Sequence, residues 1–135
     1  MIVDANVVVS ALLGRSLPLL QAVLDRGIVL VTPEQQMREI ALVTATRAAE
    51  RGVDPAVALT WATRALLVIP SEFYGSSEAA ARMRLSPAGQ KDWPLVALAI
   101  TSRDDIWSHD THLFGAGIAV WHTRNIAHAQ PMPYR

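Results

Sequence analysis

The sequence contains no cysteine, a single lysine and few aromatic residues, which make up 6% of its 135 residues. Without cysteine the chain can form neither a disulfide framework nor a thiolate zinc site, and it offers no thiolate nucleophile. Its longest apolar runs, such as PLVALAI, are far too short to cross a bilayer. The N-terminus also lacks the charged segment, apolar segment and cleavage site of a secretory signal. We therefore expect a cytoplasmic protein that does not enter a membrane.

No sign of charge dominates, because twelve Lys and Arg residues balance twelve Asp and Glu residues. A global positive field that would attract nucleic acid is therefore absent, and a polyanionic partner would have to be held by a local basic patch. Apolar residues make up 51% of the chain, which is enough for one sizeable core at this length. We expect a single domain over residues 1–135.

Short apolar segments alternate with helical patterns along the chain. Strands are expected at residues 1–4, 28–31, 67–70, 105–110 and 118–123. Helices are expected from about residue 6 to 13 and over 16–27, 33–51, 54–66, 76–85 and 93–102, with a loop at 86–90. This order predicts an α/β fold in which a central parallel β-sheet is flanked by helices on both faces.

Capping residues set the expected ends of several helices. Thr32, Pro33 and Gln35 form the pattern of a capping box, which starts a helix directly after the second strand. Gly52 is expected to end that helix, and Asp54 is expected to cap the next one. The pattern therefore predicts short connections between these elements.

Three acids fall where predicted strands end or a buried helix begins. Asp4 ends the first strand, Asp110 ends the strand at 105–110, and Asp92 begins the most apolar helix. Each could instead serve only a turn or a helix cap, where Asp is common. Ligands of parallel sheets collect beyond the carboxyl ends of the strands, so the three acids can converge there. Clustered carboxylates repel each other, and proteins usually neutralise such a cluster with a hard cation such as Mg²⁺ or Mn²⁺.

A fourth acid has two candidates on the helix after the second strand. Glu34 lies in the first turn, where a carboxylate favours the helix dipole, so a structural role is sufficient for it. Glu39 lies more than a turn further along and borders the apolar face, where a charge needs a reason. Glu39 is the stronger candidate, although it could also face solvent.

Other polar side chains near these acids offer weaker candidates. The possible phosphate-binding residues are Arg82, Arg84, Lys91 and Arg124. They lie before the Asp92 corner and after the last strand, where they could supply the local patch that a neutral chain needs. A solvated helix face explains the first two equally well. His109 and His112 flank Asp110 and could contact a phosphate, but such histidines are more often surface residues.

Four segments in this order resemble the PIN domain family, which includes the VapC-type toxins: IVDANVVVSALLG, TPEQQMREI, DWPLVALAITS, and IWSHDTHLFG with IAVWHT. The resemblance implies a ribonuclease that depends on Mg²⁺ or Mn²⁺ and cleaves single-stranded RNA. The acids that hold the metal and support catalysis in the family fall on Asp4, Glu39, Asp92 and Asp110. Asn6 takes the place of the small polar residue that follows the first acid.

The resemblance also carries expectations about metal count and partners. Many members have a further acid shortly after the last one, but here His112 and Leu113 stand there, so one or two metal ions stay open. A chain of this size fits a toxin that pairs with a separately encoded antitoxin. The helix at 54–66 carries apolar side chains over much of its surface, which predicts a homodimer.

Two other functions fit parts of the pattern. A phosphoryl-transfer enzyme with an Asp nucleophile also places an acid after the first strand, but that pattern requires a second Asp where this chain has Asn6. A metal-free binding or regulatory module on the same fold is the main alternative, because a fold does not fix a function. The loss of any of the four acids would favour that module, and all four are present.

Overall fold

The computed structural model describes residues 1–131, so residues 132–135 of the predicted domain lie outside the described part of the chain. At its centre is a five-stranded sheet with the strand order β3-β2-β1-β4-β5, in which every paired strand runs parallel to its neighbour. The strands are β1 (Ile2–Val3), β2 (Leu30–Pro33), β3 (Leu66–Ile69), β4 (Ile106–Trp107) and β5 (Val120–Trp121). The predicted α/β fold with a parallel sheet is confirmed.

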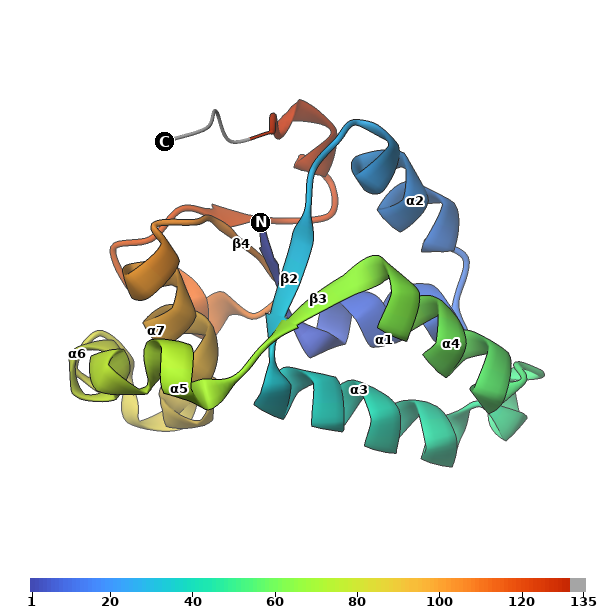
Figure 1. Cartoon of the computed structure of the whole chain (residues 1–135), viewed down its shortest axis with the longest axis horizontal. Helices are drawn as coiled ribbons and strands as arrows, with labels where there is room; N and C mark the ends of the chain where they lie inside the picture. The colour runs from blue at the N-terminus through green and yellow to red at the C-terminus, as the bar shows by residue number, and fades with distance from the viewer. Residues whose placement is uncertain (132–135) are drawn as a thin grey trace.

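Helices cover both faces of this sheet. The α-helices are α1 (Ala5–Leu13), α2 (Leu17–Asp25), α3 (Glu34–Arg47), α4 (Pro55–Ala65), α5 (Ser71–Tyr74), α6 (Glu78–Met83) and α7 (Trp93–Ser102). The 3-10 helices are η1 (Ala49–Arg51), η2 (Gly75–Ser77), η3 (Pro87–Asp92), η4 (Thr111–Leu113) and η5 (Ile126–His128). Figure 1 shows α1 to α4 on one side of the strands and α5 to α7 on the other. No single helix within residues 1–131 is long and apolar enough to span a membrane, and only α1 and α2 taken together, bent by 119° at their break, have the length and composition for it.

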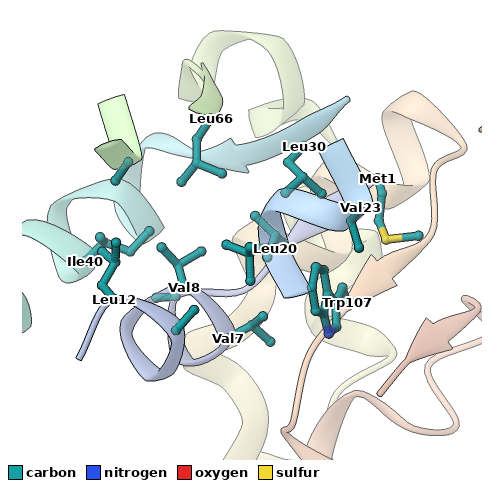
Figure 2. Close-up of a cluster of buried hydrophobic side chains, with 14 of the residues drawn as sticks. Met1, Val7, Val8, Leu12, Leu20, Val23, Leu30, Ile40, Leu66 and Trp107 are labelled. Atoms are coloured by element: carbon teal, nitrogen blue, oxygen red, sulfur yellow. The ribbon is translucent and has the colours of Figure 1, made fainter. Parts of the chain in front are cut away.

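Successive residues of the central strands point to opposite faces of the sheet. Val3 and Trp107 pack into a core with α1 to α4, whereas Ile2 and Ile106 pack into a second core with α5 to α7. Figure 2 shows the first core, where Trp107 lies among apolar side chains from α1, α2 and β2. Because both faces are covered, the central strands can be apolar throughout.

The second strand lies two residues further along the chain than predicted. The sequence predicts a strand at 28–31 and a capping role for Thr32, but β2 extends to Pro33, which directly precedes α3. Thr32 is fully buried, and its hydroxyl donates a 3.1 Å hydrogen bond to the Val3 carbonyl. Residues 30–33 also pair with β3. Contacts with both neighbouring strands thus hold Thr32 in the sheet, and the predicted capping box does not form.

The last two strands are shorter than predicted. Strands are expected at 105–110 and 118–123, but β4 and β5 contribute two residues each to the ladder. One further hydrogen bond follows, from the Ser108 N–H to the Trp121 carbonyl (3.0 Å). The Asp110 side chain then accepts a bond from the His112 N–H and begins η4. Before that point the N–H groups of His109 and Asp110 already bond to the Asn6 and Ser108 side chains instead of to β5, so the ladder ends earlier than the apolar pattern indicates.

The region before α7 contains two short helices where the sequence predicts one longer helix and a loop. The single helix expected at 76–85 is the shorter α6, and residues 87–90 of the loop expected at 86–90 belong to η3. The Gln90 side-chain amide donates to the carbonyls of Arg82 (2.9 Å) and Leu85 (3.0 Å). These bonds satisfy carbonyls that the end of α6 leaves free and turn the chain into η3.

The strand order reverses between β1 and β4. From β1 the chain adds β2 and β3 on one side, and it then crosses back to add β4 and β5 on the other. Sheets of this kind bind ligands beyond the carboxyl ends of the strands at such a reversal. The Asp4 N–H donates to the Trp107 carbonyl (3.0 Å), so the two strand ends lie directly beside each other. Residues that follow β1 and β4 therefore share one edge of the sheet.

Candidate metal centre

Asp4 lies at this edge, between the end of β1 and the start of α1. Its side chain is buried, and Oδ1 accepts a hydrogen bond from the Asn6 N–H at 3.4 Å, which caps the helix. The other oxygen, Oδ2, accepts a 2.6 Å bond from the hydroxyl of Ser108, which follows β4. Asp4 is thus a helix cap, and its second oxygen is directed across the strand reversal.

Ser108 connects two of the predicted acids, although the sequence pattern does not single it out. The residue is fully buried, and its hydroxyl donates to Asp4 while its Oγ accepts a 2.9 Å bond from the Asp110 N–H. The sequence feature that could have pointed to Ser108 is a small hydroxyl residue at the carboxyl end of an apolar strand, two positions before an acid. Ser108 fixes the position of Asp4 relative to the backbone of Asp110.

Asp110 follows β4 and caps η4. Its Oδ1 accepts a 2.9 Å bond from the His112 N–H, and the residue is half-buried. The segment η4 packs against η3, which ends at Asp92. At Gly89 in η3 an added Cβ would lie 3.0 Å from the His112 Cβ. Glycine therefore permits the close approach that brings the segments carrying Asp92 and Asp110 together.

Asp92 occupies the cap position of α7 without acting as a side-chain cap. It is only 6% exposed, and its side chain accepts no hydrogen bond from the first turn of the helix. Its Oδ2 is buried and has no hydrogen-bond partner within residues 1–131. Buried carboxylate oxygens are normally satisfied, so an unpartnered one points to a missing ligand. The capping interpretation does not account for this side chain.

The acids influence one another electrostatically. Burial raises the pKa of Asp4 above its ordinary value of 3.8; the hydrogen bond from Ser108 lowers it, and the charges of Glu39 and Asp110 raise it further. Burial, followed by the charges of Asp4 and Asp110, raises the pKa of Asp92 to about 7. The nearby Asp110 side chain thus favours the protonated form of Asp92 and raises its pKa, whereas the charge of Lys91 favours the ionised form and lowers it. Three carboxyl groups therefore meet at one edge and repel each other.

The two candidates for the fourth acid lie in different surroundings. Glu34 accepts a 2.9 Å bond from the Ser71 N–H and pairs with Arg38 at 3.3 Å, so it connects α3 to α5. Glu39 is exposed, makes no such connection within the described chain, and its charge acts on Asp4. Of the two, Glu39 is therefore the one placed beside the acidic edge.

The side chains present fit a hard divalent cation. Their ligand atoms are carboxylate oxygens, which Mg²⁺ and Mn²⁺ prefer, and Asp92 offers a buried oxygen that has no other partner among residues 1–131. A cation would also relieve the mutual repulsion that raises the pKa of Asp92. Across residues 1–131, however, no group of three or more His, Asp or Glu side chains forms a ready-made metal site. Glu39 and Asp110, which are partly or fully exposed, have the freedom to adjust.

The predicted basic residues are distributed unevenly around this edge. Lys91 is exposed and its charge acts on Asp92, and Arg124 is exposed just after β5, at the same end of the sheet. Arg82 pairs with Glu78 at 2.7 Å and lies 5.3 Å from the ring centre of Trp93.

Arg84 points away from the acids. Its Nη1 donates to the Ala116 carbonyl at 3.3 Å, and it lines a pocket with Asp104 and Asp105. Asp104 and Asp105 precede β4, and Ala116 precedes β5. Arg84 therefore lies at the end of the strands opposite to the acids. The structure thus brings Lys91 and Arg124 toward the acidic edge but not Arg84.

The two predicted histidines also separate. His109 is partly buried, its ring bonds to the Thr123 hydroxyl, and its centre lies 5.0 Å from that of His122. Burial and the neighbouring His122 lower the pKa of His109. The backbone N–H of His109 donates a 3.5 Å hydrogen bond to Oδ1 of Asn6, an exposed residue of α1. His112 is exposed and contributes through its backbone N–H to Asp110.

The substitution Ser108→Ala is expected to lower Mn²⁺ affinity by about 10–100-fold, because residues that orient metal ligands have effects of this size. The substitution removes the hydroxyl that holds Asp4 Oδ2 and the acceptor for the Asp110 N–H. Calorimetric titration would measure the affinity. The matched control is Ser102→Ala, since the Ser102 hydroxyl donates to the Leu98 carbonyl of its own helix and has no other bond in the described part of the chain. Equal losses in both variants would contradict a positioning role for Ser108.

Comparisons with known proteins identify one family. The family model described as PIN domain matches residues 2–130. The matched region extends from β1 to η5 and contains all four predicted acids. No curated protein matches the chain.

Proposed function

Since the chain belongs to the PIN domain family, whose fold is of the nuclease type, we propose that it is an endoribonuclease that uses Mg²⁺ or Mn²⁺ to hydrolyse phosphodiester bonds of RNA. The observation that carries the proposal is Asp92, a buried carboxylate at the strand reversal with an oxygen that has no partner in the described chain. Asp4 and Asp110 converge on the same edge, and Glu39 lies within electrostatic reach of it. Four acids at one edge suit a cation that binds a phosphate.

Each acid has a distinct part in this proposal. Asp4 is held by Asn6 and Ser108, so it provides a fixed ligand oxygen. Asp92 provides the oxygen that has no competing partner, and Asp110 and Glu39 close the site from the exposed side. When bound, the cation supplies Lewis acidity, which activates water and stabilises charge on the phosphate. The acids hold the metal and need not touch the RNA.

Lys91 and Arg124 are the proposed phosphate contacts next to the acids. Both are exposed, and both lie at the carboxyl end of the strands. Arg82 is less available because Glu78 and Trp93 hold its guanidinium. Arg84 could contact a phosphate only if the RNA reached the far end of the sheet. A few contacts of this kind suit RNA binding by a chain with zero net charge.

More specifically, we propose that the protein is a cytoplasmic VapC-type toxin that forms a homodimer and pairs with an antitoxin protein. Exposed apolar side chains on α4 and on the edge strand β3 support an interface between chains: Val57 is 67% exposed and Leu67 is 56% exposed. Apolar surface of this kind often marks a site of protein association. The same side chains would suit either a second copy or an antitoxin.

The purified protein is expected to cleave single-stranded RNA in Mg²⁺ or Mn²⁺, and EDTA is expected to abolish the cleavage. A labelled RNA resolved on a denaturing gel gives the measurement, and a structured RNA of equal length shows whether pairing protects the substrate. Restoration of cleavage by excess Mn²⁺ after EDTA is the control for damage to the protein. RNA binding without metal-dependent cleavage would instead indicate a metal-free binding module.

A further inference from the structure

A groove of about 430 Å³ runs between α1 and α3 and opens beside the acidic edge. Residues on one face of α1 form one wall, and residues on one face of α3, followed by Arg51 of η1, form the other. The polar side chains nearest the acids in this groove are Asn6 and Glu39. Those at the far end are Arg47 and Arg51. The groove thus leads from the candidate metal centre to a pair of arginines.

The two arginines have no partner of their own. Both are exposed, and neither guanidinium forms a salt bridge or a hydrogen bond with any residue of the range 1–131. Glu39 and Arg47 are on the same face of α3, eight residues apart, so about 12 Å of helix separates them. The far end of the groove is therefore positively charged, whereas the near end carries the acids.

The floor of the groove between these ends is apolar. Val9 and Leu13 of α1 and Val43 of α3 are partly exposed there, and Ser10 adds a hydroxyl. A surface with an apolar floor and unpaired cations at one end is complementary to a chain that carries negative charges and flat apolar bases. An acidic peptide would match the arginines, but a nucleic acid strand also has bases for the apolar floor and a phosphate for the cation that the acids are proposed to hold.

We propose that the α1–α3 groove binds the RNA strand on one side of the cleaved bond, with Arg47 and Arg51 holding backbone phosphates of neighbouring nucleotides. This inference rests on the proposed ribonuclease function and assigns the path of its substrate. Lys91 and Arg124 contact the strand at the acids, and the groove contacts it further along. Arg51 belongs to η1, which ends at Gly52 in the left-handed conformation (φ 66°), so a defined turn sets its position.

The test uses the full-length Asp92→Asn protein, which is expected to bind RNA without cleaving it. Its affinity for labelled oligouridylates of increasing length is measured by fluorescence anisotropy over a series of salt concentrations. Arg47→Ala and Arg51→Ala are each expected to weaken binding several-fold and to reduce the slope of log affinity against log salt by about 0.7. The shortest oligouridylates, which fill the metal centre alone, should show no difference. Arg47→Lys should keep the slope, because it retains the charge.

Arg64→Ala is the matched control, because Arg64 is an exposed arginine of α4 outside the groove. Unchanged binding in Arg47→Ala and Arg51→Ala at every length would overturn the groove assignment, and so would an equal loss in Arg64→Ala. Cleavage by the wild-type protein would still stand in either case, so the ribonuclease proposal would survive. Binding of an acidic peptide to the groove with no effect of either arginine on RNA would likewise overturn it.

Discussion

The substitution Asp92→Asn is expected to reduce metal-dependent RNA cleavage by at least about 1,000-fold, which corresponds to about 4 kcal/mol of transition-state stabilisation. The amide keeps the size of the side chain but presents a neutral group where Asp92 directs an unpartnered oxygen. Asp4 and Asp110 would then have to hold a divalent cation with one charge fewer. The rate is measured on single-stranded RNA at saturating Mn²⁺, and circular dichroism verifies the fold.

Asp54→Asn is the matched control for this loss. Asp54 caps α4 by accepting a 2.9 Å bond from the Ala56 N–H, and asparagine caps helices equally well. The control therefore makes the same chemical change away from the acidic edge and should cleave RNA at the wild-type rate. Full activity in the Asp92→Asn protein would show that the cleavage comes from another site or another protein.

Asp92→Asn is also expected to stabilise the metal-free protein, by an amount that grows with pH. The pKa of Asp92 is raised from 3.8 to about 7, because burial and the charges of Asp4 and Asp110 disfavour its ionised form. A raised folded-state pKa contributes stability that is complete below about pH 4 and is lost as the pH rises through about 7. Asparagine does not ionise, so the variant avoids this loss, which is on the order of 2–4 kcal/mol.

Urea unfolding without metal at about pH 4 and about pH 8 tests this linkage. The variant and the wild type should differ little at the lower pH, and the variant should be the more stable protein at the higher pH. Mn²⁺ at the higher pH should reverse the order, because only the wild type gains a counter-charge for Asp92. Equal stability at both pH values without metal would contradict a buried, repelled carboxylate at this position.

The fold could be predicted because its signals are local and redundant. Apolar segments such as Ile2–Val3 alternate with helices, and parallel strands need a crossover connection that is usually a helix. The boundaries could not be predicted where distant contacts override local signals. Thr32 has the sequence of a cap, but its bond to the Val3 carbonyl holds it in β2. Gln90 lies in an expected loop, yet its amide organises the start of η3.

The candidate site could be predicted to the extent that it depends on strand ends. The sequence predicts that Asp4 and Asp110 each end a strand, and the structure makes these strands neighbours and brings both acids to the edge where Asp92 begins α7. Their roles as metal ligands stay predictions. Ser108 carries only a weak signal in the sequence, a small hydroxyl two positions before an acid, because its importance comes from two hydrogen bonds made only in the folded chain. Arg84 lies near Asp92 in sequence but reaches the other end of the sheet.

The α1–α3 groove could not be predicted at all, because it depends on how two helices separated by α2 and β2 pack together. In the sequence Arg47 and Arg51 look like ordinary solvated residues at the end of a helix. Only the packing of α3 against α1 makes them part of a groove that leads to the acidic edge.

Calorimetric titration of Mn²⁺ into the wild-type, Asp4→Asn and Asp54→Asn proteins tests the central claim most directly, because it measures metal binding without RNA. Asp4 is the acid most firmly held, by Ser108 and by the start of α1. The account predicts saturable binding to the wild type and to Asp54→Asn, and a loss of binding in Asp4→Asn. Equal Mn²⁺ affinity in all three proteins would place the metal elsewhere and contradict the account.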